Sequence, residues 1–280
     1  MYYAGIDIGS TWTKAVIVDE APAVVGKLVR QTGPEHRKLA NKVMEDLLAQ
    51  VGLPFEEIAY LVATGYGRVN VPFADTHVTE LTCHAKGVLH FFPGVGAAID
   101  VGGQDAKALR IRGGRLVNFV MNDKCAAGTG RFLEVLADVL EVELGELGPI
   151  SLGARKPVTI SSVCTIFAQQ EIVNHLSAGH SIEDVIAGVH EAMAGRIVRM
   201  ARSLGVDGDV VLTGGVAKNV GFVRAVEGSL GRPVLVPEDS FITGALGAAL
   251  AAREKCEKLA ARGQPVPRKP RRLAEARFFT

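Results

Sequence analysis

A short sequence pattern occurs twice in the first half of the chain and restricts the fold more than any other feature. Residues 6–17 read IDIGSTWTKAVI and residues 99–110 read IDVGGQDAKALR, so Asp7 matches Asp100 and Lys14 matches Lys107 without a gap. Each copy is an apolar run that ends in Asp, a glycine turn and a second apolar run, which predicts a β-hairpin. A supersecondary unit repeated at this long spacing indicates two similar lobes and not a solenoid.

Strand-like and helix-like segments alternate along the remaining chain, which predicts an α/β fold. Besides the two hairpins, strands are expected at 24–31, 58–67, 115–123 and 209–215, and helical patterns cover 34–52, 79–92, 182–205 and 241–255. We therefore expect a first lobe over 1–95 and a second lobe over 96–256. The alternative for the helix near 242–256 is that it packs back on the first lobe. The basic segment 257–280 is expected to be a flexible tail.

The composition gives no indication of nucleic-acid or membrane binding. The chain has 31 Lys and Arg against 30 Asp and Glu, a formal net charge of +1, so no globally basic surface is expected. No apolar run approaches the ~18 residues of a membrane span, and the first residues lack the basic and apolar regions of a signal peptide. We therefore expect a cytoplasmic protein whose thiols are reduced.

The glycine turns of the two hairpins have the chemistry of a phosphate cradle. Glycine allows backbone N–H groups to converge on phosphate oxygens, and Ser10, Thr11 and Lys14 add hydroxyl donors and positive charge. One such turn by itself is more simply a tight hairpin. Two copies, together with the strand and glycine pair of LTGGVAKN at 212–219, favour nucleotide binding. The P-loop pattern and the dinucleotide-binding glycine pattern are both absent from the sequence.

Three side chains of the repeats are candidates for the chemistry of hydrolysis. Asp7 and Asp100 end the first strand of each copy, where a carboxylate can hold Mg²⁺ through water. Gln104 is polar and neutral, which suits it to orient an attacking water. The sequence therefore predicts a site for ATP or ADP with Mg²⁺.

The motifs DIGSTWTK, DVGGQDAK and LTGGVAKN resemble the phosphate-1, phosphate-2 and adenosine motifs of the acetate and sugar kinase, chaperone ATPase and actin superfamily. This resemblance implies two ribonuclease-H-like lobes with ATP in the cleft between them. The candidate nucleotide-binding residues are Ser10, Thr11, Lys14, Gly102, Gly103, Gln104, Ala127, Gly128, Thr129, Gly130, Gly214, Gly215, Val216, Lys218 and Gly244.

Two of the four cysteines precede helical patterns, and both are therefore expected at helix N-termini. Cys125 lies before a glycine-rich turn and a helix, and Cys164 lies directly before another. A helix N-terminus favours a thiolate or an anion bonded to it, although a free cysteine is more commonly a buried core residue. Two thiolates cannot complete a four-thiolate cluster, but a C2 dimer supplies two such pairs across its axis. One [4Fe–4S] cluster shared by two subunits is the simplest function that uses the pair.

The segments around these cysteines, NDKCAAGTGRFLEV and SSVCTIFAQQE, resemble the activators of 2-hydroxyacyl-CoA dehydratases and the ATPase subunits of benzoyl-CoA reductases. The resemblance implies a homodimer that bridges one [4Fe–4S] cluster through Cys125 and Cys164. It also implies that ATP hydrolysis drives one electron to a partner iron–sulfur enzyme. The donor would be a ferredoxin or flavodoxin, and the acceptor a dehydratase, a benzoyl-CoA reductase or a double-cubane-cluster reductase. Trp12 departs from this pattern, which has a small residue at that position.

Two other functions remain open at this point, a small-molecule kinase of the same fold and a dimeric metal or redox sensor. The turn at 126–130 is expected to connect the cysteine to the nucleotide site. Cys83 is expected in the core with His84 partly exposed beside it, because adjacent helix positions make a poor chelating pair. Cys256 lies near the end of a helical pattern and is expected to have no role in the site.

Overall fold

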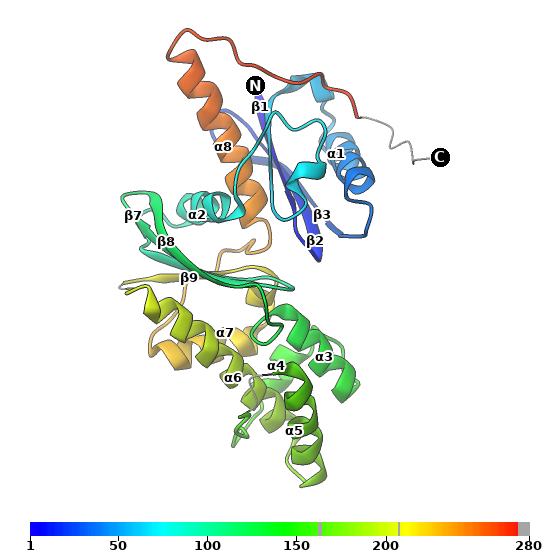
Figure 1. Cartoon of the computed structure of the whole chain (residues 1–280), viewed down its shortest axis with the longest axis vertical. Helices are drawn as coiled ribbons and strands as arrows, with labels where there is room; N and C mark the ends of the chain where they lie inside the picture. Colours follow the sequence, from blue (N-terminus) through cyan, green and yellow to red (C-terminus); the bar gives the residue numbers. More distant parts are fainter. Residues whose placement is uncertain (162–163, 207, 274–280) are drawn as a thin grey trace. The chain divides into compact units, whose positions relative to one another are not determined.

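The computed structural model describes residues 1–161, 164–206 and 208–273. The chain forms two compact units, each organised around one β-sheet (Figure 1). Unit 1 comprises Met1–Pro93 and the chain from Ile242 onward, and unit 2 comprises Gly94–Phe241. The predicted α/β class is confirmed in both units, since helices pack on both faces of the sheet of unit 1 and on one face of the sheet of unit 2.

The sheet of unit 1 has the strand order β3-β2-β1-β4-β5. Its first three strands form an antiparallel meander, and β4 and β5 continue the sheet parallel to β1. The strands are β1 (Tyr2–Ile8), β2 (Trp12–Val18), β3 (Val24–Gln31), β4 (Ile58–Thr64) and β5 (Thr76–His77). The segments η1 (Phe55–Glu57) and η2 (Arg68–Asn70) are short 3-10 helices. The first hairpin is therefore built as the repeat predicts.

Helices pack on both faces of this sheet, which explains why β1 and β4 are buried along almost their whole length. The helix α1 (His36–Val51) contributes to the core on one face, and α2 (Glu80–Phe91) and α8 (Thr243–Ala260) to the core on the other. A Cβ on Gly5 would collide with the α8 backbone at Ala245. The small side chains of α8 and the glycine in β1 thus allow helix and strand to approach closely.

The position of α8 corrects the expected division of the chain. The range 96–256 assigned this helix to the second lobe, whereas α8 packs on β1, β2 and β4 of unit 1. The return of the helix to the first lobe was the alternative considered from the sequence. The physical reason is that Gly5 of β1, which has no side chain, lets the small residues of α8 pack closely on the strand.

The sheet of unit 2 has the strand order β8-β7-β6-β9. The hairpin of β6 and β7 again places an Asp opposite a Lys, because Asp100 pairs with Lys107 as Asp7 pairs with Lys14. The strands are β6 (Ala97–Val101), β7 (Ala106–Arg112), β8 (Arg115–Asn122) and β9 (Val210–Thr213), with β9 parallel to β6.

The helices of unit 2 come after β8 in the chain, some of them before β9 and the others after it. Its elements are α3 (Gly130–Leu140), α4 (Leu147–Ser151), α5 (Thr165–Ser177), α6 (Ile182–Ser203), the 3-10 helix η3 (Gly215–Lys218) and α7 (Val220–Leu230). The side chain of Ser181 caps α6 by accepting a hydrogen bond from the backbone N–H of Asp184 at 3.2 Å. Among the described residues, no helix combines the length and apolarity needed to cross a membrane.

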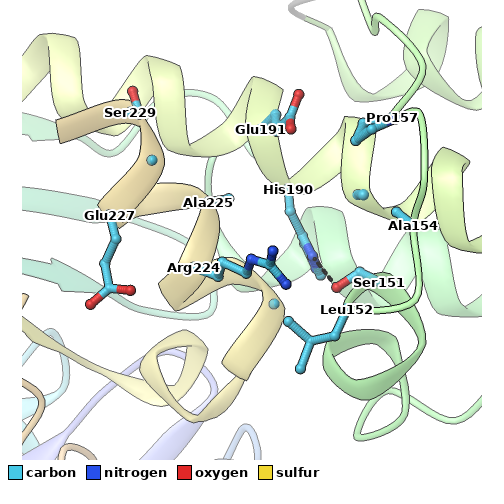
Figure 2. A pocket seen from close by; sticks show the side chains of 13 residues that line it. Ser151, Leu152, Ala154, Pro157, His190, Glu191, Arg224, Ala225, Glu227 and Ser229 are labelled. Atoms are coloured by element: carbon cyan, nitrogen blue, oxygen red, sulfur yellow. Dashed lines mark hydrogen bonds between the residues drawn. The ribbon is translucent and has the colours of Figure 1, made fainter. Parts of the chain in front are cut away.

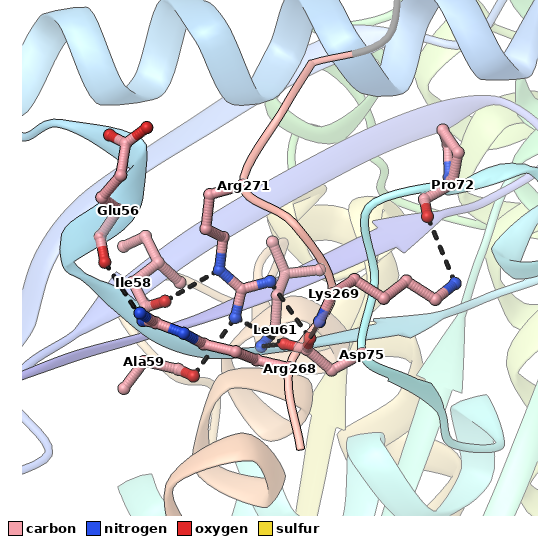
Figure 3. Close-up of polar contacts among 9 residues, drawn as sticks. All are labelled: Glu56, Ile58, Ala59, Leu61, Pro72, Asp75, Arg268, Lys269 and Arg271. Carbon is pink, nitrogen blue, oxygen red and sulfur yellow. Dashed lines mark hydrogen bonds and ion pairs between the residues drawn. The ribbon is translucent and has the colours of Figure 1, made fainter. Parts of the chain in front are cut away.

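The segment after α8 is held against unit 1, contrary to the expectation of a flexible tail (Figure 3). The guanidinium of Arg271 donates to the carboxylate of Asp75 at 2.7 and 3.1 Å and to the carbonyl of Ile58 at 2.9 Å. The backbone N–H of Lys269 also donates to Asp75, at 2.6 Å. The Asp75 side chain is fully buried, and a buried carboxylate requires partners of this kind. This finding applies to the tail up to Leu273, and residues 274–280 lie outside the described range.

Candidate functional site

Each hairpin of the repeat holds a buried carboxylate beside a lysine. In unit 1, the Lys14 Nζ lies 3.2 Å from an oxygen of Asp7, which is 4% exposed. In unit 2, the Lys107 Nζ lies 3.6 Å from Asp100 and 2.7 Å from Asp105. Opposite charges at this distance offset part of the cost of burying each carboxylate. The two repeats therefore share a charge arrangement as well as a backbone shape.

The turn between β1 and β2 carries the other candidate residues of the first repeat. Ser10 is exposed and Thr11 is half-buried, and the N–H of Gly9 donates to the carbonyl of Trp12 at 3.1 Å to close the turn. Trp12 is 38% exposed and keeps its place in the β2–β3 pairing. The large side chain of Trp12, at a position where the family pattern has a small residue, therefore leaves the hairpin intact.

Gly244, at the start of α8, belongs to the surroundings of Asp7. A Cβ at Gly244 would lie 2.9 Å from Asp7 Oδ2 and 3.1 Å from the Nε2 of His84. His84 is thus buried, 8% exposed, at the edge of the carboxylate site and not partly exposed as expected. Only a tertiary contact between α2 and α8 brings it there.

The turn between β6 and β7 presents Gly102, Gly103 and Gln104. Gln104 is exposed, and the Gly102 N–H donates to the carbonyl of Asp105 at 2.9 Å. Behind this turn, Asp100 accepts a hydrogen bond from the hydroxyl of Thr213 at 2.9 Å. Thr213 was not identified as a site residue, although its position at the end of a strand before Gly214 is a recognisable signal.

The helix α3 is joined directly to this turn. The N–H of Gly130 donates to the carbonyl of Gly102 at 2.8 Å, and the N–H of Arg131 donates to that of Gly103 at 2.7 Å. A Cβ on Gly130 would lie 3.2 Å from the Gly102 oxygen, so the absence of a side chain permits the approach. The segment 126–130 therefore contacts the second phosphate-motif turn inside unit 2.

Three candidate nucleotide residues have buried side chains: Ala127, Thr129 and Val216. The Thr129 hydroxyl is used internally, since it donates to the carbonyl of Ala126 at 2.7 Å. Gly128 between them has a φ of 88°, a conformation that glycine adopts without strain. These residues shape the turn through their backbone.

The glycine pair after β9 lies close to two other backbone segments. Gly214 has a φ of 90°, and a Cβ there would collide with Val101 of β6. A Cβ on Gly215 would lie 2.6 Å from the ring of Phe241, and the Lys218 Nζ lies 4.6 Å from the centroid of the same ring. Both glycines are therefore required for the close packing around the motif.

Cys164 is the N-cap residue of α5, as the sequence predicts, and the structure shows it exposed. The second and third residues of α5 have large exposed apolar side chains, since Ile166 is 71% exposed and Phe167 is 69% exposed. An exposed thiol is thus flanked by an apolar surface at the start of a helix.

Cys125 corrects part of the sequence expectation. It lies four residues before Thr129, the N-cap of α3, so it precedes the helix without occupying its N-terminus. The physical reason is the turn at 126–129, which the N–H of Thr129 closes by donating to the carbonyl of Ala126 at 3.0 Å. Cys125 itself is half-buried.

The loop of Cys125 is held by Asn122, the last residue of β8. The Nδ2 of Asn122 donates to the carbonyl of Cys125 at 2.9 Å and to that of Ala127 at 3.1 Å. Sequence reasoning quoted Asn122 within the NDKC motif but gave it no role. Its position three residues before the cysteine is the signal that identifies it.

The other two cysteines lie in the core of unit 1. Burial raises the pKa of Cys83 to about 12, and burial also raises the pKa of Cys256. Within residues 1–161, 164–206 and 208–273, no group of three or more His, Cys, Asp or Glu side chains is arranged to hold a metal ion.

Comparisons with known proteins agree with this geometry. The model of the BadF/BadG/BcrA/BcrD ATPase family matches residues 4–252. The 2-hydroxyisocaproyl-CoA dehydratase activator of Clostridioides difficile is 45% identical over 259 residues, which cover 92% of this chain and 97% of that protein. The activator of lactoyl-CoA dehydratase of Anaerotignum propionicum is 47% identical over 260 residues, covering 92% of this chain and 100% of that protein.

A solved structure extends the similarity to three dimensions. The activator of the 2-hydroxyisocaproyl-CoA dehydratase from Clostridium difficile with bound ADPNP superimposes with a TM-score of 0.87 at 43% identity. The match covers 95% of this chain and 100% of that one. The predicted class of two ribonuclease-H-like lobes is thereby confirmed.

Proposed function

The chain belongs to the BadF/BadG/BcrA/BcrD ATPase family, and from this premise we propose that it is the ATP-hydrolysing activator of a 2-hydroxyacyl-CoA dehydratase. The names of relatives that are 45% and 47% identical across nearly their whole length support this role. The single structural observation that carries the proposal is the hydrogen-bonded contact between the Cys125 segment and the second phosphate-motif turn. This contact connects the segment proposed to bind phosphate with the segment proposed to hold the cluster, and an activator must couple ATP hydrolysis to electron transfer.

We propose that ATP binds to the glycine turns of both repeats and to Gly214 and Gly215. The backbone N–H groups of these turns and Lys14 supply positive potential for phosphate oxygens. Asp7 and Asp100 would hold Mg²⁺ through water, since each carboxylate already has a protein partner. Gln104 is exposed at its turn and would orient the attacking water.

We further propose that Cys125 and Cys164 are two of the four ligands of a [4Fe–4S] cluster shared with a second copy of the chain. Both thiols are accessible at least in part, and thiolates are the ligands that such a cluster takes. When bound, the cluster would supply a one-electron redox centre. The exposed Ile166 and Phe167 beside Cys164 provide apolar surface for contact between the two copies.

The protein's own part in coupling is to transmit a change at the phosphate-motif turn to the cysteine loop. Two backbone hydrogen bonds join Gly102 and Gly103 to the start of α3, and the same turn leads back to Cys125. A shift of the Gly102–Gly103 carbonyls on ATP hydrolysis would therefore displace the ligand loop. Such a displacement changes the field and solvent access at the thiolates, which sets the reduction potential.

Other acceptors of the same class remain alternatives, namely a benzoyl-CoA reductase or a double-cubane-cluster reductase. A kinase role has less support, because neither the sequence nor the described residues indicate a catalytic base beside an acceptor site. We propose a ferredoxin or flavodoxin as electron donor and the cytoplasm as compartment.

The proposal is tested by anaerobic purification with iron and sulfide quantification. About one [4Fe–4S] cluster per dimer is expected, and Cys125→Ser and Cys164→Ser should each abolish it. The matched controls Cys83→Ser and Cys256→Ser should retain it, because these thiols lie in the core of unit 1. Colourless protein with stoichiometric zinc would contradict the cluster, and phosphorylation of a small acceptor at ordinary kinase rates would contradict the activator role.

A further inference from the structure

A buried histidine of α6 connects three helices of unit 2. His190 is 1% exposed and lies in the wall of a cavity of about 780 Å³ (Figure 2). Its Nδ1 lies 3.1 Å from the hydroxyl of Ser151 in α4, and its Nε2 lies 3.2 Å from the Nδ2 of Asn219, which caps α7. The side chains of all three residues are thus linked in one chain of hydrogen bonds.

The Ser151 end of this chain determines where the imidazole carries its proton. The Ser151 hydroxyl donates to the carbonyl of Gly148 at 2.8 Å, so its single proton is already committed. The serine oxygen can therefore only accept from His190. The Nδ1 must carry a proton, and the Nε2 of a neutral imidazole is then an acceptor.

The Asn219 end gives the same answer independently. The Oδ1 of Asn219 accepts from the backbone N–H of Phe222 at 2.9 Å, which is its capping bond. Since the backbone N–H can only donate, the amide orientation is fixed and the Nδ2 faces His190. A donating Nδ2 requires an unprotonated Nε2. Both ends of the chain therefore demand a neutral histidine protonated on Nδ1.

Burial acts in the same direction as the hydrogen bonds. It lowers the pKa of His190 to about 4, so the imidazole is neutral at physiological pH. The charged groups that line the adjoining cavity are Glu191 of α6 and Arg224 and Glu227 of α7. The ring of Phe222 packs edge-on to the imidazole with centroids 6.3 Å apart.

Glycines on the neighbouring helices allow this chain to form. A Cβ on Gly148 would lie 2.8 Å from the Oδ1 of Asn219, and a Cβ on Gly221 would collide with the Ser151 hydroxyl and lie 3.0 Å from the His190 Nδ1. The packing of α4, α6 and α7 is therefore closest where the hydrogen bonds are. Such a site holds its members in one arrangement.

Asn219 directly follows the turn of Gly214, Gly215 and Lys218. Its backbone N–H donates to the carbonyl of Val216 at 3.0 Å, which closes η3. An Asn219 side chain held from both ends thus fixes the end of this turn and the start of α7 together.

We infer that His190 is a positioning residue for the nucleotide: as a neutral imidazole protonated on Nδ1, it orients Asn219 and so holds the Gly214–Lys218 turn in its binding conformation. The inference rests on the proposed function, which assigns that turn to the adenosine part of ATP. His190 itself touches no reacting atom.

The substitution Asn219→Asp separates this role from helix capping. Asp caps a helix as well as Asn does, so the bond from Phe222 is kept. The amide donor is replaced by a carboxylate oxygen, which faces the unprotonated Nε2 of His190. The carboxylate should raise the pKa of His190 and disturb the turn. Asn118→Asp on the exposed part of β8 is the matched control for the change in charge.

The measurements are ADP affinity by calorimetry and ¹⁵N chemical shifts of the histidine rings, with His190 assigned from its absence in His190→Gln. The wild-type protein should show the Nδ1-protonated neutral ring at pH 7. Asn219→Asp should weaken ADP binding about tenfold, the size of effect expected for one lost hydrogen bond at a buried site. Asn118→Asp should bind ADP as the wild type does.

Several results would overturn the inference. One is a wild-type ring protonated on Nε2, which can be measured even if the variant does not fold. Another is an Asn219→Asp protein that binds ADP as tightly as the control with an unchanged His190 titration. Absence of ADP binding in the wild-type protein would overturn the proposed function itself, and the inference with it.

Discussion

Asn122→Ala should release the cysteine loop without unfolding unit 2. The side chain of Asn122 donates to the carbonyls of Cys125 and Ala127, and alanine removes both bonds. The backbone of Asn122 remains paired with Ala106 in the sheet, so β8 should persist. The internal bonds of Thr129 to Ala126 also remain. The perturbation is therefore confined to the part of the loop that carries the thiol.

The size of the effect follows from the number of bonds lost. A hydrogen bond contributes about 1 kcal/mol net, so two bonds to the loop contribute about 2 kcal/mol. A factor of ten corresponds to ~1.4 kcal/mol, and the open form of the loop should become about 30-fold more populated. If a metal chelator attacks through this open form, the rate of iron loss should rise by a similar factor.

The assay is release of iron to a coloured chelator from anaerobically reconstituted protein, with circular dichroism as a check of the fold. Asn118→Ala is the matched control, since Asn118 lies on the same strand and its side chain accepts only from the adjacent N–H of Phe119 in the described contacts. An Asn122→Ala protein that loses iron within twofold of the control would refute the reasoning. Faster iron loss that is accompanied by a general loss of secondary structure would also refute it, because the perturbation would then not be confined to the loop.

Gln104→Ala should retain ADP binding yet slow ATP turnover, because positioning water lowers the barrier and not the ground-state energy; unchanged turnover in a phosphate-release assay would remove Gln104 from the mechanism. Arg271→Ala should lower the free energy of unfolding by about 3 kcal/mol in urea titrations because it leaves Asp75 buried and uncompensated, whereas exposed Arg272→Ala should change it by less than about 0.5 kcal/mol. Iodoacetamide at pH 8 should label Cys164 in the folded protein with its cluster removed and not Cys83, whose raised pKa disfavours the thiolate; equal labelling would contradict the burial. A redox titration with ADP and then with ADP plus aluminium fluoride should give different potentials, where a tenfold difference in nucleotide affinity corresponds to ~59 mV for one electron, and identical potentials would defeat the coupling mechanism.

The sequence predicted correctly those parts of the candidate site whose conformation depends on residues adjacent in the chain. The two hairpins follow from alternating apolar runs around a glycine turn, and Cys164 follows from its place before a helical pattern. Cys125 shows the limit of this reasoning. Its motif was recognised, but the four-residue offset from Thr129 depends on how the turn at 126–129 closes, which spacing does not specify.

By itself, the sequence determined the α/β class, the paired hairpins with their Asp and Lys, and the family to which the cysteine motifs point. Only the tertiary structure decided that α8 packs on unit 1, that Arg271 neutralises Asp75 across 196 positions of chain, and that Asn219 reaches His190. The physical reason is the range of the interactions. Backbone conformation and apolar periodicity are set by neighbours in sequence, whereas a buried polar group is satisfied by whichever partner the folded chain brings within hydrogen-bonding distance.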